Sequence, residues 1–116
     1  MTTPLRNRAT AVVMRDGKVL LVKGSGKFAM PGGGIDDGEL PIVAAARELW
    51  EETGLEPKRI EYLFTWESDI HRHEVFRVEA EGDVEIAPGE ITDFLWRDRE
   101  DDLPTYGHVE TILKRL

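Results

Sequence analysis

Hydrophobic and polar positions recur with two different periods along the chain, and each period predicts a different kind of element. Two runs of β-branched and aliphatic residues, Arg8–Met14 and Val19–Lys23, flank an Asp16-Gly17 pair, which is the pattern of a β-hairpin. Three more segments are rich in β-branched and aromatic residues and predict strands, at Arg59–Trp66, His73–Ala80 and Ile91–Trp96. The chain is therefore expected to contain at least five strands, the first two of them adjacent.

Two segments show helical spacing instead. Pro41 suits the first position of a helix and Gly54 its C-terminal cap, which predicts a helix from Pro41 to about Thr53. Its core-facing arc is expected to hold Ile42, Ala45, Ala46, Leu49 and Thr53. A second helix is predicted at Tyr106–Leu116, with an inward face of Val109, Ile112, Leu113 and Leu116. The order of strands, helix, strands and helix predicts a mixed α/β or α+β fold.

A glycine-rich loop precedes the first predicted helix. Pro31 is followed by three consecutive glycines, Gly32 to Gly34. Such a run cannot form a stable helix or strand interior by itself, so the backbone is expected to turn sharply or to approach another group closely.

Length and composition narrow the class of protein. A chain of 116 residues, 41% hydrophobic and 33% charged, predicts a single globular domain over residues 1–116. The longest apolar run, Ile42–Ala46, is far too short to cross a membrane, and no apolar stretch follows Met1, so we expect a cytoplasmic location without membrane attachment. Because the chain has no cysteine, any metal must bind oxygen or imidazole ligands. The sequence leaves room for a homodimer.

The net charge of −8 excludes one class of partner and suggests another. An acidic surface repels the phosphate backbone, so general nucleic-acid binding is not expected. Carboxylates can still reach an anionic substrate through a divalent cation.

The predicted first helix concentrates acidic residues on one face. Glu48, Glu51 and Glu52 lie together at helical spacing, and Arg47 is the one basic residue between positions 41 and 53. Like charges at this spacing destabilise a helix by a few tenths of a kcal/mol per pair, whereas a divalent cation would turn the repulsion into coordination. The alternative is an ordinary solvated helix surface.

A longer pattern joins the glycine loop to this helix. Residues 33–55 read G-x5-E-x7-R-E-L-x-E-E-x-G-L, beginning at Gly33 and ending at Leu55. This pattern resembles the Nudix box at every fixed position, and the preceding Phe28–Gly34 segment is similar to the entry loop of that family. The resemblance implies an α/β/α sandwich around a mixed β-sheet. It also implies that the chain hydrolyses a diphosphate bond in a nucleoside diphosphate linked to another group, with Mg²⁺ or Mn²⁺ as cofactor.

The resemblance also assigns roles by position. Glu48, Glu51 and Glu52 would bind the metal together with a backbone carbonyl of Gly32 or Gly33, and Glu51 belongs to the catalytic set as well. Arg47 would orient the glutamates, and Glu39 would anchor the loop to the helix. The general base is either Glu48 or Glu90, although Glu90 also fits as a polar residue beside the Pro88-Gly89 turn.

Selectivity must come from outside this pattern, because phosphates and metal are common to every substrate of the class. The candidates for substrate contacts are two histidines and three aromatic residues, with core packing as the rival role for the aromatic ones: His71, His73, Phe28, Trp66 and Phe76.

Three functions remain open at this point. The first is hydrolysis of a small-molecule nucleotide, either a nucleoside triphosphate or a modified nucleotide. The second is a catalytically silent nucleotide-binding or regulatory domain of the same family, and the intact set of three glutamates favours the enzyme over it. The third, isomerisation of isoprenyl diphosphate, is disfavoured by the short chain and the absence of cysteine.

Overall fold

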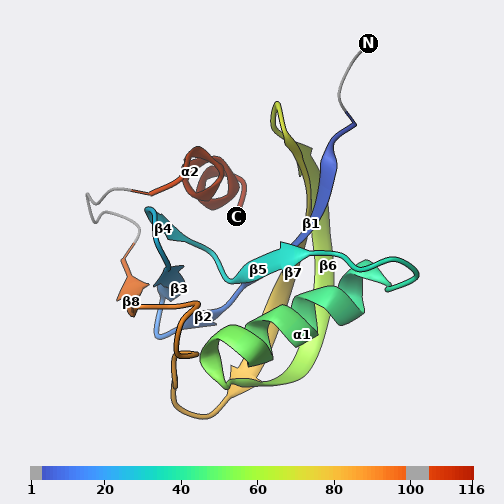
Figure 1. Ribbon diagram of the computed structural model, residues 1–116. Coiled ribbons are helices and arrows are strands. Elements are labelled where there is room, and N and C mark those ends of the chain that lie inside the picture. The colour runs from blue at the N-terminus through green and yellow to red at the C-terminus, as the bar shows by residue number, and fades with distance from the viewer. Residues whose placement is uncertain (1–3, 99–104) are drawn as a thin grey trace.

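The computed structural model describes residues 4–98 and 105–116, which form two four-stranded sheets and two helices (Figure 1). The elements are, in chain order, β1 (Arg6–Val12), β2 (Met14–Arg15), β3 (Lys18–Lys23), β4 (Phe28–Ala29), β5 (Gly32–Gly34), α1 (Pro41–Thr53), β6 (Glu56–Glu67), β7 (His71–Glu81), β8 (Asp93–Arg97) and α2 (Gly107–Lys114).

The first sheet has the strand order β5-β1-β7-β6 and is mixed. Strand β1 runs parallel to β7 and antiparallel to β5, while β6 and β7 form a long antiparallel ribbon. In the second sheet β3 pairs with β2, β4 and β8. The predicted mixed α and β architecture is confirmed.

The predicted hairpin at the start of the chain is only partly right. Asp16 and Gly17 do form the turn, both with positive φ (54° and 76°), and they join β2 to β3. The preceding strand β1, however, belongs to the other sheet, and the pairing with β3 begins only at Val13, whose carbonyl accepts from the N–H of Leu20. Both faces of β1 are buried, since Ala9 and Ala11 belong to one core and Val12 to another, so a place between two neighbouring strands suits it better than a hairpin edge.

Two hydrophobic cores lie on opposite faces of β1. Helix α1 buries Ala44, Ala45 and Leu49 in the first core, and helix α2 buries Val109, Ile112 and Leu113 in the second. The strands therefore lie between the helices (Figure 1), which is the predicted α/β/α sandwich. Neither helix is long and apolar enough to cross a membrane, as far as the described residues show.

The inward faces of both helices differ from the prediction at their ends. Ile42 is 40% exposed and Leu116 is 37% exposed, whereas Ala44 and Glu52 are buried. Leu116 lies beyond the end of α2 at Lys114, so helical periodicity no longer directs its side chain. The C-terminal cap of α1 is as predicted, because Gly54 has a φ of 71° and its N–H donates to the carbonyl of Trp50.

Candidate active site

The acidic face of α1 packs directly against the glycine strand β5. At Gly33 an added Cβ would lie 2.5–2.7 Å from the carboxyl atoms of Glu48, and at Gly32 it would lie 2.2 Å from the carbonyl oxygen of Ala9. The N–H of Gly32 donates to Oε1 of Glu52 at 3.4 Å. The glycines are therefore required for close approach, because any side chain here would displace a carboxylate or a neighbouring strand.

Arg47 fixes several of these carboxylates at once. Its guanidinium binds both oxygens of Glu39, with Nε to Oε2 at 2.7 Å and Nη2 to Oε1 at 2.9 Å. Nη1 donates to Glu48 at 2.9 Å and to Glu51 at 3.3 Å, and Nη2 donates to the carbonyl of Gly34 at 3.2 Å. The hydrogen bonds from Arg47 hold the pKa of Glu39 at about 2, and the bonds that Arg47 donates to Glu39 and Glu48 raise its own pKa. This network holds the loop before α1 against the helix.

Glu52 differs from the other carboxylates because it is buried. Its exposed fraction is 7%, and the one hydrogen bond of its side chain with the described residues is the long contact with Gly32. The pKa of Glu52 is raised to about 8, mainly by burial and also by the nearby charges of Glu48 and Glu90, while the Gly32 N–H and Arg8 oppose the shift. At neutral pH, without a cation, the protein holds Glu52 mainly in its protonated form.

The chemistry of this face fits a hard divalent cation. Its donors are oxygens, and a cation beside Glu52 would supply the charge that the buried carboxylate lacks. Among residues 4–98 and 105–116, however, no three acidic or histidine side chains are already gathered around a common point. Arg47 explains part of this arrangement, because its Nη1 lies between Glu48 and Glu51. Glu48 and Glu52, which face the glycine strand, are therefore the best placed of the three predicted metal ligands.

Glu90 lies next to this site although it is far from it in sequence. The segment before it runs along the end of α1, where the N–H of Ala87 donates to the carbonyl of Glu52. The Glu90 side chain is exposed, and its charge contributes to the raised pKa of Glu52. The structure thus brings Glu90 close enough to act on Glu52 through space.

A cavity of about 810 Å³ opens on the α2 side of the first sheet. Three of the predicted substrate residues line it, namely Trp66, His71 and His73. Sequence reasoning missed several further lining residues, among them Arg8, Tyr106 and His108. These three come from β1 and from the start of α2, and no local pattern in the sequence links them to the histidines of β7.

The aromatic rings of the cavity lie against one another. The ring of His73 lies 5.2 Å from Trp66 and 4.9 Å from His108, with which it is stacked. Burial, together with the charge of Arg8, lowers the pKa of His73 to about 4 and that of His108 to about 3. Both imidazoles are therefore neutral at physiological pH. A wall of flat, uncharged rings suits a planar aromatic ligand.

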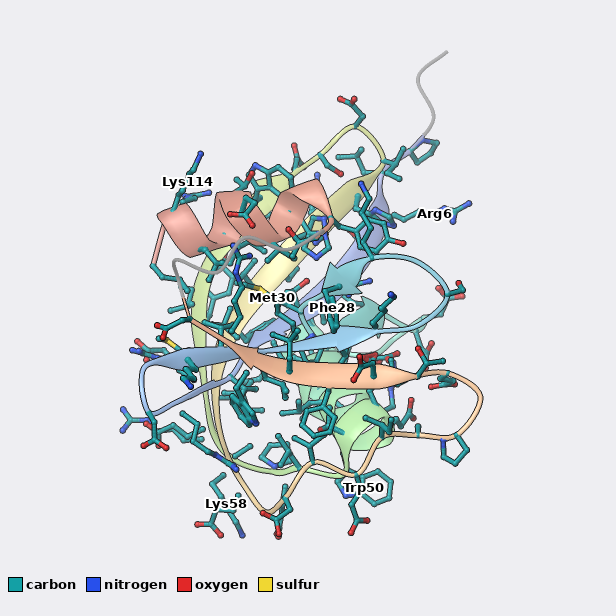
Figure 2. The ribbon with its side chains drawn as sticks, turned by 90° about the vertical axis from the view of Figure 1, so that its left-hand side faces the viewer. Arg6, Phe28, Met30, Trp50, Lys58 and Lys114 are labelled. Atoms are coloured by element: carbon teal, nitrogen blue, oxygen red, sulfur yellow. The ribbon has the colours of Figure 1, made fainter. Side chains whose placement is uncertain are left out.

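The remaining two substrate candidates do not line the cavity. Phe76 is 4% exposed and packs in the core beneath α1, with its ring edge-on to Tyr62 at 5.7 Å. Phe28 is half-buried and packs against the core beneath α2, and Figure 2 shows its side chain close to Met30. Core packing accounts for both residues.

Comparison with known proteins identifies the family. A NUDIX domain model matches residues 5–110. The chain is 33% identical over 92 residues to a MutT-like protein from Streptomyces ambofaciens, which covers 76% of this chain and 60% of that protein. It is 62% identical over 36 residues to an RNA pyrophosphohydrolase from Cereibacter sphaeroides, which covers 31% of this chain and 22% of that protein. These matches span less than two thirds of the length of either relative.

Solved structures show the same fold over the whole chain. A nudix hydrolase family member from Chromobacterium violaceum superposes with a TM-score of 0.90 at 28% identity, over 99% of this chain and 78% of that one. The chain belongs to the NUDIX family.

Proposed function

We propose that this protein hydrolyses a phosphoanhydride bond in a nucleoside triphosphate or a modified nucleotide, with Mg²⁺ or Mn²⁺ as cofactor. The observation that carries the proposal is the buried Glu52, held beside Glu48 against the glycine strand with its pKa raised to about 8. A family member in which position 52 served stability alone would be more stable with an apolar residue in place of the buried glutamate. The aromatic cavity next to the same sheet supplies a place for the base.

Each residue of the site has a distinct task in this reaction. A bound Mg²⁺ or Mn²⁺ would neutralise phosphate charge and make the attacking water more acidic. Glu48 and Glu52 would hold the cation, and Gly32 and Gly33 let the backbone approach both carboxylates. Arg47 restrains Glu48 and Glu51, so that these side chains do not have to be ordered when substrate binds.

The proton of the attacking water needs an acceptor, and the arrangement favours Glu90 over Glu48. One oxygen of Glu48 is already occupied by a hydrogen bond from Arg47, and Glu48 is also a proposed ligand of the cation, so it has less room to receive the proton of the water. Glu90 is exposed, forms no ion pair with the described residues, and lies within electrostatic reach of Glu52. Glu90→Gln should therefore lower kcat at saturating metal, while Mg²⁺ affinity stays near that of the parent. A loss of Mg²⁺ affinity in this variant would place Glu90 among the ligands instead.

The catalytically silent alternative makes a different prediction for the same site. A domain that only binds nucleotides does not need a buried carboxylate at Glu52, and the complete set of glutamates argues against it. One relative is named an RNA pyrophosphohydrolase and another a MutT-like protein, so the names support pyrophosphate hydrolysis without selecting the substrate of this chain.

A panel of nucleoside triphosphates and nucleotide sugars, assayed with Mg²⁺ for phosphate and pyrophosphate release, tests the proposal. We expect turnover of at least one member, and a loss of turnover by orders of magnitude in Glu52→Gln. Glu85→Gln serves as a matched control, because Glu85 is an exposed glutamate near the end of α1. Nucleotide binding without turnover of any member would support the silent alternative.

A further inference from the structure

Arg8 is a cation held in the cavity wall with few partners. It lies on β1, where it pairs with Gly34 of β5 on one side and His73 of β7 on the other. Its Nη2 donates to the carbonyl of Met30 at 3.1 Å. Its Nε is buried and has no hydrogen-bond partner, and Arg8 forms no ion pair with any described residue.

Burying such a group is unfavourable unless something compensates. A guanidinium presents five N–H donors, and removing any of these donors from water without a hydrogen-bond acceptor costs free energy. Burial lowers the pKa of Arg8, although Glu52 and Glu48 oppose that shift through space. The described part of the chain does not complete the hydrogen bonding of Arg8, so its position is better explained by a ligand than by stability.

The place of Arg8 indicates which part of a ligand it meets. Arg8 lines the cavity together with Trp66 and His73. Its neighbour in β5 is Gly34, which directly follows Gly33, the residue that lies against the Glu48 carboxylate. Arg8 therefore lies between the aromatic rings and the acidic face. In a nucleotide, the group between the base and the reacting anhydride bond is the sugar with its first phosphate.

We propose that Arg8 binds an anionic oxygen of the 5′-phosphate of a nucleotide whose base occupies the aromatic cavity. The inference rests on the proposed function in taking a nucleotide as the ligand, and it adds the residue that connects the cavity to the glutamates. Guanidinium and phosphate pair through charge-assisted hydrogen bonds, for which the free Nε offers a donor.

The test compares ligands that differ only in the phosphate. Binding of adenosine, guanosine, cytidine and uridine, and of their 5′-monophosphates, is measured by calorimetry without metal. None of these ligands contains an anhydride bond, so nothing is hydrolysed during the measurement. For Arg8→Gln we expect a loss of roughly tenfold to a hundredfold in monophosphate affinity and little change in nucleoside affinity. Arg8→Lys keeps the charge but lacks Nε, and should retain part of the affinity. Arg6→Gln, an exposed arginine on the same strand, is the matched control.

Each other outcome overturns the inference. Equal losses for nucleosides and monophosphates in Arg8→Gln would mean that Arg8 contacts the base. Unchanged affinities in a folded variant would remove Arg8 from the site, and so would a parent protein that binds none of the monophosphates at millimolar concentration. If Arg8→Gln does not fold, the same comparison in Arg8→Lys decides. The hydrolysis panel is read separately, so turnover in the parent with no selective loss in the Arg8 variants would refute this inference and leave the proposed function standing.

Discussion

Replacing Glu52 by glutamine should separate the chemistry of the site from the stability of the fold. Glu52 is 7% exposed, and its pKa of about 8 in the folded protein compares with an ordinary value of 4.5. The substitution keeps the volume and the hydrogen-bonding shape of the side chain but removes its charge. Without metal, the parent must give up this proton to ionise a buried carboxylate, whereas the variant never ionises.

The size of the effect follows from the two pKa values. Between pH 4.5 and pH 8 the folded parent keeps a proton that the unfolded chain has released, so its free energy of unfolding falls as pH rises. The stability linked to this group is complete below pH 4.5 and is lost as pH passes 8. At about 1.4 kcal/mol per pH unit over the 2.5 units from pH 4.5 to pH 7, the parent at pH 7 is less stable than Glu52→Gln by up to about 3.5 kcal/mol.

Urea unfolding with a chelator, repeated from pH 4.5 to 8.5, measures this difference directly. We expect the two proteins to be about equally stable near pH 4.5 and the variant to gain steadily at higher pH. Glu51→Gln is the control, because Glu51 is 44% exposed and solvent screens its charge, so its difference from the parent should stay nearly flat. A flat difference for Glu52→Gln as well would refute the reasoning that Glu52 is desolvated.

Three further predictions concern the metal, the glycine strand and the aromatic residues. Millimolar Mg²⁺ should raise the melting temperature of the parent but not of Glu52→Gln, because only a folded site binds the ion; equal shifts would place the ion elsewhere. Gly33→Ala should lower kcat for every substrate alike, because its methyl group displaces the Glu48 carboxylate; parent-like kcat in steady-state assays would contradict this contact. Trp66→Ala should weaken binding by about 1–3 kcal/mol through lost stacking and change the ranking of substrates in KM, whereas Phe76→Ala should lower stability by about 3–5 kcal/mol in thermal or urea unfolding. The reverse pattern would exchange the roles given to Trp66 and Phe76.

Some features of the fold could be predicted because their signals are local. Pro41 and Gly54 define the two ends of α1 by their own backbone preferences, and the Asp16-Gly17 turn forms wherever the strands on either side go. The acidic face of α1 follows from helical spacing alone. What local signals could not provide is the destination of β1, which depends on the strands that it meets in the folded sheet.

The same division between local sequence signals and long-range contacts applies to the candidate site. The glutamates and their glycine strand are close in sequence and belong to one motif, so the resemblance to the Nudix box already implied that they would meet. The cavity is assembled from β1, the β6–β7 ribbon and α2, and Arg8 and His108 became candidates only once those elements were placed. Strand alternation did contain one usable signal: His73 and Phe76 are an odd number of residues apart and must point to opposite faces of β7.

The dependence of turnover on Mg²⁺ tests the central claim most directly. For the best nucleotide of the panel, the rate of phosphate or pyrophosphate release is followed as Mg²⁺ is added to chelator-treated protein, in the parent and in Glu52→Gln. The account predicts no turnover without metal, a saturable rise in the parent, and a rate lower by orders of magnitude in the variant at every Mg²⁺ concentration. Equal turnover by the two proteins, or turnover by the parent that persists without any divalent cation, would contradict it.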